Sequence, residues 1–287
     1  MQVEPSAETA SEARSSARSR LLARYRDAAF ANSVAAPQWN AVLDTMLAHR
    51  SVRAYRKTPL PPGSLEAIVA AAQSAPTSSN LQAWSVVAVQ DPARKARLSQ
   101  LAAGQRHVAE APLLLVFLAD LARLGQIACE RGQNAEGINY LEAFVVAVAD
   151  AALAAQNALI AAESLGLGGC YIGALRNHPQ EVAEELALPD AVFAAFGLTI
   201  GYPDPTVATS VKPRLPQAVV LHHEQYQRAA SSALANYDGC LRSFWAEQKM
   251  SDIDWTEHVA ACVQNREALM GRDALRAILQ ARGFGLR

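Results

Sequence analysis

The sequence contains few cysteines and no paired metal-ligand motif. Its 287 residues include four cysteines that are far apart in the chain: Cys129, Cys170, Cys240 and Cys262. None belongs to a C-x-x-C pair or has a histidine at zinc-ligand spacing, which excludes the common zinc modules. We therefore predict no metal site, and we expect reduced, structural thiols in a cytoplasmic protein.

An overall excess of basic residues is also absent. The formal net charge is -1 and the pI is about 6.6, whereas nucleic-acid-binding domains usually carry a basic balance. This argues against a nucleic-acid partner. The charge is uneven, however, because residues 1–57 hold nine Lys and Arg against five Asp and Glu. The asymmetry predicts a local anion site near the start of the chain.

Secretory and membrane-spanning segments are not predicted. The N-terminus has charges throughout and no apolar core, which argues against a secretory signal and favours an amphipathic helical arm over residues 1–38. A long apolar stretch starts at Phe144, but it contains Asp150, Gln156 and Asn157. A carboxylate at mid-bilayer costs roughly 2.5 to 3.5 kcal/mol. We therefore predict a long buried helix whose remaining apolar faces a dimer partner would cover.

Several well-known catalytic and nucleotide-binding signatures are missing. The segment "GLGGCYIG" has Tyr171 where a G-x-G-x-x-G fingerprint needs its third glycine, and it follows a helix instead of a strand. No P-loop, H-E-x-x-H or G-x-S-x-G motif occurs. These absences exclude the Rossmann, P-loop, zincin and nucleophile-elbow sites.

Alternating helix and strand signals predict one α+β domain over residues 39–287. Short apolar runs predict strands at 84–90, 113–119 and 196–202, and the segment from Gly168 predicts a fourth. Helices are expected over the following stretches: 37–49, 64–75, from 92, 144–165, 228–248 and 255–281.

The cationic stretch "AHRSVRAYRKTPL", residues 48–60, is the first candidate site. If it leaves a helix as extended chain, Arg50 and Arg53 can reach around one anionic ligand while Ser51 donates its hydroxyl group. The alternative is that these cations only complement the negative end of a helix dipole.

Two further segments can present polar groups to a ligand. "APTSSNLQAW" carries Thr77, Ser78, Ser79 and Asn80 just before a strand, although an ordinary turn explains the same composition. "KPRLP" holds Lys212 and Arg214 between prolines, and alone it would be a solvated loop.

With "GQRHVAEAP" and "AAESLGLGGCYIGALRN", these segments form five ordered matches between Leu47 and Tyr237. Through these five segments and their order, the chain resembles the FMN-dependent nitroreductase and flavin reductase family, most closely its oxygen-insensitive NADPH-dependent branch. The resemblance implies a nitroreductase-like α+β fold with a central, mostly antiparallel sheet flanked by helices. It also implies an intertwined homodimer with two FMN molecules at the interface.

The resemblance assigns roles to individual positions of this chain. Residues that match the family's phosphate-binding positions are His49, Arg50, Ser51, Lys212 and Arg214. Residues that match its flavin-ring positions are Arg53, Gln105, Tyr171, Ile172 and Gly173. Residues that match the segment contributed by the other subunit are Thr77, Ser78, Ser79 and Asn80.

The implied activity is an NAD(P)H-dependent FMN oxidoreductase that works without a general base or a nucleophile. Hydride passes from nicotinamide to FMN and then to free flavin, quinones or nitroaromatics, which predicts ping-pong kinetics. The loop at 246–254 has Lys249 as its only cation, so either NADH or NADPH use is compatible with the sequence. Alternatives are a flavin-binding relative with other chemistry, such as reductive dehalogenation or flavin destruction, and a non-enzymatic regulator.

Overall fold

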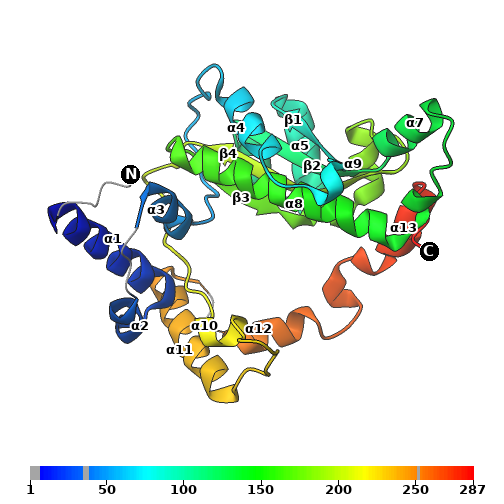
Figure 1. Ribbon diagram of the computed structural model, residues 1–287. Coiled ribbons are helices and arrows are strands. Elements are labelled where there is room, and N and C mark those ends of the chain that lie inside the picture. Colours follow the sequence, from blue (N-terminus) through cyan, green and yellow to red (C-terminus); the bar gives the residue numbers. More distant parts are fainter. Residues whose placement is uncertain (1–6, 35–38, 251–252) are drawn as a thin grey trace. The chain divides into compact units, whose positions relative to one another are not determined.

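The computed structural model describes residues 7–34, 39–250 and 253–287. The chain divides into two compact units. The first combines Met1–Arg50 with Ala208–Ala268, and the second combines Ser51–Val207 with Leu269–Arg287. We call them the arm unit and the sheet unit, and Figure 1 labels their helices and strands.

The sheet unit is built on an antiparallel sheet with the strand order β1-β2-β4-β3 among the described residues. Its strands are β1 (Trp84–Val89), β2 (Leu113–Asp120), β3 (Gly168–Ile172) and β4 (Val192–Gly201). Phe117 of β2 lies opposite Phe196 of β4, and Gly169 of β3 lies opposite Ile200. The predicted antiparallel sheet and its strands are confirmed.

Both faces of the sheet are buried, which explains the uninterrupted apolar run in β2. Alternate side chains of a strand point to opposite faces. Leu115 and Phe117 accordingly pack with Ile68, whereas Leu114 and Val116 belong to the core on the other face. Every residue of β2 is buried as a result.

The long helix α8 (Leu141–Ser164) lies along one face of the sheet beside α4 (Ser64–Gln73) (Figure 1). Alanines such as Ala151, Ala154 and Ala158 form its buried face, and their small side chains let the helix approach its neighbours closely. Its length and apolar composition would also suit a membrane span, and 39% of its apolar stretch is buried inside the protein. Packing on the sheet identifies α8 as a core helix.

The remaining helices and turns of the sheet unit cover its other face and its ends. They are η1 (Ser78–Asn80), α5 (Pro92–Leu101), α6 (Arg106–Glu110), α7 (Ala122–Glu130), η2 (Glu136–Asn139), η3 (Gly173–Asn177), α9 (Pro179–Glu185), η5 (Arg272–Ala274) and α13 (Leu275–Ala281). Asp91 caps α5 by accepting a hydrogen bond from the backbone amide of Arg94, as expected for an N-cap aspartate.

The arm unit is helical. Its helices are α1 (Ala7–Tyr25), α2 (Ala28–Ser33), α3 (Ala41–Ala48), α10 (Gln217–Val220), α11 (Ser231–Glu247) and α12 (Trp255–Cys262). Tyr237, Leu241 and Phe244 of α11 form a small core, and Trp255 of α12 packs against it. The N-terminal arm is more than a solvated helix, because Ala17 and Leu21 of α1 are buried.

Some predicted helix boundaries differ from the structure. Helix α3 begins at Ala41 after the N-cap Asn40, and the predicted start at Pro37 lies outside the described residues. Helix α4 begins at Ser64 as predicted, and Gly63 is its N-cap. The predicted helix over 255–281 is instead two helices, α12 and α13, with short turns between them. Gly271, in one of these turns, adopts a left-handed backbone with φ 86°.

Candidate functional site

The cationic stretch follows α3 as non-helical chain, and its residues Val52 and Arg56 bond to Gly169 and Tyr202 of the sheet unit. Val52 is buried, and its backbone amide donates a hydrogen bond to the Gly169 carbonyl oxygen at 3.0 Å. Ser51 and Arg53 on either side are exposed. Gly168 has no room for a side chain, because an added Cβ would lie 2.5 Å from a Val52 methyl carbon. The packing of Val52 therefore directs its two polar neighbours outward.

Arg24 of α1 serves the C-terminal end of α3. Its Nη2 donates to the carbonyl oxygens of Leu47, at 2.9 Å, and His49, at 2.8 Å. A cation in this place complements the negative end of the helix dipole. The side chain of Arg50 is directed elsewhere, since its Nε donates to Thr209 Oγ1 at 2.8 Å. The cation that complements the dipole of α3 is thus Arg24, a residue outside the cationic stretch that the sequence did not single out.

The "KPRLP" segment is held through its backbone. The Lys212 carbonyl oxygen accepts a hydrogen bond from Arg24 Nη1 at 2.9 Å, and the Arg214 amide donates to the Arg24 carbonyl oxygen at 2.9 Å. The Pro213 carbonyl oxygen accepts a hydrogen bond from the Tyr237 hydroxyl group at 3.0 Å. The side chains of Lys212 and Arg214 are exposed. Within the arm unit, Arg24 therefore joins the His49 segment to the Lys212–Arg214 segment.

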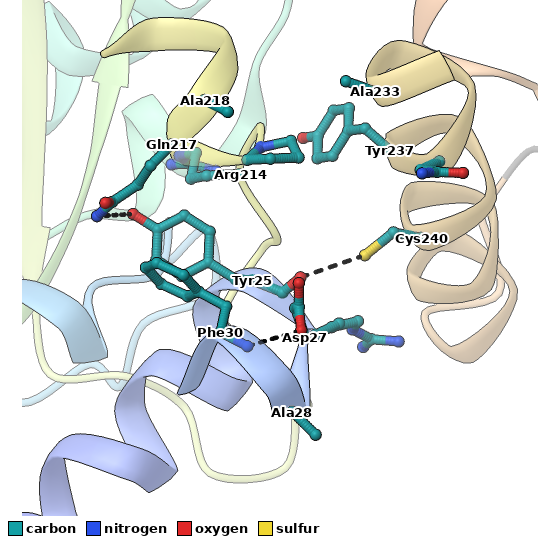
Figure 2. Close-up of a pocket in the computed structure, with 13 residues that line it drawn as sticks. Tyr25, Asp27, Ala28, Phe30, Arg214, Gln217, Ala218, Ala233, Tyr237 and Cys240 are labelled. Carbon is teal, nitrogen blue, oxygen red and sulfur yellow. Dashed lines mark hydrogen bonds between the residues drawn. The ribbon is translucent and has the colours of Figure 1, made fainter. Parts of the chain in front are cut away.

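Arg214 also lines a cavity of about 710 Å³ in the arm unit. Figure 2 shows this cavity, with Tyr25, Phe30, Tyr237 and Cys240 among its labelled lining residues. Burial raises the pKa of the Cys240 thiol, so that it stays protonated at neutral pH. The lining thus combines three aromatic rings and neutral groups with the charged side chains of Arg26, Asp27 and Arg214.

The segment 77–82 has an unusual backbone. Ser79, Asn80 and Gln82 all have positive φ angles, of 48°, 55° and 51°. Such angles are uncommon outside glycine and require support from the surroundings. Asp150 of α8 supplies it by accepting hydrogen bonds from the backbone amides of Ser78 and Ala83, both at 3.0 Å.

The polar side chains of this segment point away from that anchor. Ser78, Ser79 and Asn80 are exposed, and Thr77 is partly buried. In the described part of the chain, no hydrogen bond joins the segment to Ser51, to Arg53 or to the end of β3. Within the sheet unit, the described residues thus show no direct hydrogen bond between this segment and the other predicted site residues.

The strand β3 delivers Tyr171, Ile172 and Gly173 to the end of the sheet. Ile172 is buried, whereas the ring of Tyr171 is partly exposed and packs edge-on against Phe196 with centroids 5.4 Å apart. Burial raises the pKa of Tyr171, so its hydroxyl group stays neutral. The Val52–Gly169 hydrogen bond brings the Ser51–Arg53 segment next to this strand.

Gln105 precedes α6, and its carbonyl oxygen accepts a hydrogen bond from the Ser99 hydroxyl group at 2.8 Å. Two positions later lies His107, whose Nε2 atom is buried and has no hydrogen-bond partner among the described residues. Burial lowers the pKa of His107, and the positive charge of Arg53 lowers it further. Arg53 and the Gln105–His107 segment thus face a common region of the sheet unit.

Sequence reasoning missed three of these residues. Arg24 is one of several arginines in the arm and has no distinguishing neighbours, and Asp150 was noted only as an obstacle to membrane insertion. His107 stands inside a quoted motif, and its closeness to Gln105 was the available signal. Among the described residues there is no cluster of histidine, cysteine and carboxylate side chains that would hold a metal ion.

The loop after α11 carries less negative charge than its sequence suggests. Glu247 forms an ion pair with Arg26, at 2.5 Å, and Asp254 forms one with Arg242. Lys249 has no ion-pair partner among the described residues. The two pairs neutralise the acids nearest to Lys249 within residues 246–250 and 253–254.

Comparison with known proteins agrees with this architecture. Residues 46–202 match the model of the nitroreductase family, and residues 212–287 match the nitroreductase family, C-terminal domain. An FMN reductase (NADPH) from Bacillus subtilis is 40% identical over 213 residues, which cover 73% of this chain and 85% of that protein. An oxygen-insensitive NADPH nitroreductase from Salmonella typhimurium is 39% identical over 219 residues, covering 76% of this chain and 88% of that one.

A solved structure adds the three-dimensional comparison. The NADPH:FMN oxidoreductase from Vibrio harveyi, complexed with NAD+, superposes with a TM-score of 0.77 at 33% sequence identity. The match covers 86% of this chain and 100% of the other. On the family model, the identities and the fold together, this chain belongs to the nitroreductase family.

Proposed function

We propose that the protein is an FMN-dependent NAD(P)H oxidoreductase that reduces free flavin, quinones or nitroaromatics by a ping-pong mechanism. The observation that carries the proposal is a set of arginines without counter-charges. Within the described residues, Arg50, Arg53 and Arg214 form no ion pair with a carboxylate. Such side chains suit a dianionic phosphate and an electron-rich ring, and the similar proteins include FMN reductases.

Different residues are assigned to the phosphate of FMN, to its ring and to the FMN of a second copy. His49, Arg50, Ser51, Lys212 and Arg214 hold the phosphate. Arg53, Gln105 and the backbone of Tyr171–Gly173 hold the flavin ring. Thr77, Ser78, Ser79 and Asn80 contact the FMN of a second copy, which is compatible with the lack of a hydrogen bond from this segment to Ser51, Arg53 or the end of β3 among the described residues.

FMN supplies the hydride chemistry when bound, so no side chain of this protein has to form a covalent bond. Arg53 supplies a fixed positive charge that stabilises the negative charge added on reduction. Tyr171 stays neutral because burial raises its pKa, and it contributes an aromatic surface. We assign no catalytic acid, base or nucleophile.

The nucleotide is assigned as NADPH or NADH. Among the described residues, Glu247 and Asp254 pair with arginines, and Lys249 is the contact that we assign to a nucleotide phosphate. Several relatives bear names that specify NADPH, whereas one solved relative is a complex with NAD+.

The assembly is assigned as a homodimer in the cytoplasm. Leu141, Val145 and Leu153 on α8 are about half exposed in the single chain, and a second copy would cover them. The four cysteines are free thiols. We further assign residues 1–38 as an arm and residues 39–287 as one FMN-binding domain with a C-terminal helical extension.

The test is anaerobic reduction of the purified protein. The protein should carry FMN and be yellow, and stopped-flow mixing with NADH or NADPH should bleach the flavin before any acceptor is added. A flavin that neither nucleotide bleaches would contradict the oxidoreductase and favour other flavin chemistry. A colourless protein with strongly salt-dependent affinity for DNA would favour the regulator.

A further inference from the structure

The N-terminal helix α1 lies outside both family matches, which cover residues 46–202 and 212–287. Its residue Arg24 is nevertheless 6% exposed and makes the contacts that join the two cationic segments of the arm unit. We propose that Arg24 is a positioning residue for the FMN phosphate, a role that rests on the phosphate site proposed above.

The guanidinium group of Arg24 forms hydrogen bonds to both cationic segments. Arg24 Nη2 donates to two carbonyl oxygens at the end of α3, Leu47 and His49, and Nη1 donates to the carbonyl oxygen of Lys212. The hydrogen atoms of Nη2 are thereby both used. Positions 24, 49 and 212 are distant in sequence, so this single planar group sets the spacing of two separate loops.

The backbone of Arg24 also bonds to the Lys212–Arg214 segment. Its carbonyl oxygen accepts a hydrogen bond from the Arg214 amide at 2.9 Å. With the Tyr237 hydroxyl group on the Pro213 carbonyl oxygen, each residue of the Lys212–Arg214 segment has its backbone fixed. The side chains of Lys212 and Arg214 stay exposed, as a cradle for an anion requires.

The guanidinium group of Arg24 lies in a buried side chain and is bonded to backbone carbonyl oxygens. A buried cation is stable only where hydrogen bonds replace its hydration. Arg24 meets this requirement with backbone carbonyls, so it keeps its positive charge while it orders the segments that carry Arg50 and Arg214. Glutamine is neutral and shorter than arginine, so its side chain would lack the charge and could not reach all three carbonyl oxygens.

The experiment compares FMN with riboflavin, which lacks the phosphate. Flavin affinities of the apoprotein are measured by fluorescence titration for the wild type, Arg24→Gln, Arg24→Lys and the control Arg20→Gln. Arg20 also lies on α1 and pairs with Asp44 of α3, at 3.2 Å, and among the described residues it makes no hydrogen bond to either cationic segment. Thermal melting of each apoprotein reports folding separately.

Arg24→Gln should weaken FMN binding at least tenfold and riboflavin binding less than twofold. Arg24→Lys keeps the charge but cannot span three carbonyl oxygens, so it should give a smaller loss and serves if Arg24→Gln does not fold. Arg20→Gln should leave the ratio of FMN to riboflavin affinity unchanged.

Two results would overturn the inference, and they are distinguishable. If the wild type prefers FMN strongly and both Arg24 variants keep that preference, Arg24 is only structural while the phosphate site stands. If the wild type binds both flavins equally, the phosphate site itself fails, and the inference fails with it.

Discussion

The carboxylate of Asp150 on α8 accepts a hydrogen bond from the backbone amide of Ser78, with an oxygen–nitrogen distance of 3.0 Å. Its second oxygen accepts another from the amide of Ala83 at the same distance. Asp150 is 1% exposed, so these bonds form away from water. They tie the strained segment with Ser79 and Asn80 to the core helix, and the rigidity of that segment depends on one buried carboxylate.

Replacing Asp150 with asparagine should destabilise the protein. The asparagine side chain has one acceptor atom, so one of the two backbone amides loses its partner. A buried donor left unpaired costs about 1–3 kcal/mol. Urea unfolding should show this loss, whereas the exposed Glu142→Gln on the same helix should change stability by less than about 0.5 kcal/mol. An unchanged unfolding midpoint for Asp150→Asn would refute the anchoring role.

Replacing Arg50 and Arg214 together with alanine should give a colourless protein of lower stability. Loss of the phosphate contacts removes FMN, and a ligand at 100 times its Kd contributes about 2.7 kcal/mol to stability. Flavin absorbance per chain and thermal melting measure the two effects. Arg56→Ala with Lys57→Ala is the matched control, because these exposed cations lie beyond the proposed site. Stoichiometric FMN in the Arg50 and Arg214 variant would contradict the assignment.

Replacing Arg53 with alanine should make the midpoint potential of the bound flavin more negative. The guanidinium group no longer stabilises the charge that reduction adds, and a shift of about 30 mV corresponds to roughly 1.4 kcal/mol for a two-electron couple. Anaerobic redox titration measures the potential, and Arg53→Lys should shift it less. Equal potentials in all three proteins would remove Arg53 from the ring site.

His107 should contribute to a loss of stability at mildly acidic pH. Burial, and then the charge of Arg53, lowers the pKa of His107 in the folded protein, while nearby Glu110 partly opposes the effect. Below the unfolded pKa of about 6.5 the unfolded chain binds a proton that the folded chain does not, so stability falls as pH falls from there towards the folded pKa.

The variant His107→Asn tests this by urea unfolding at pH 7 and pH 5. It should lose less stability across this interval than the wild type does. Identical pH dependence in the two proteins would show that His107 titrates alike in the folded and unfolded states.

Lys249→Ala should reduce the preference for NADPH over NADH. A hydrogen bond to a charged group contributes about 1.5–3 kcal/mol, and an exposed lysine should lie near the low end, about tenfold in relative rate. Stopped-flow bleaching with each nucleotide gives the ratio. A ratio that does not change would exclude Lys249 from the nucleotide site.

Much of the fold could be predicted from local sequence. The apolar runs at 84–90 and 113–119 became β1 and β2, and the run at 196–202 became the end of β4, which begins earlier at Val192. Helix α5 begins at Pro92, as predicted. The helix over 255–281 could not be predicted well, since Met270 and Gly271 take left-handed angles that depend on the surrounding fold.

The sequence by itself determined the strands, the core helix and the positions of the cationic and polar segments, because burial and turn preferences act on neighbouring residues. The antiparallel pairing of the strands followed from the family resemblance. Only the tertiary structure decided that Arg24 binds Lys212, 188 positions away, and that Asp150 binds Ser78, 72 positions away. Hydrogen bonds depend on distances of about 3 Å, which follow from how the chain packs and not from its order. The supports of the proposed site were therefore invisible until the chain was folded.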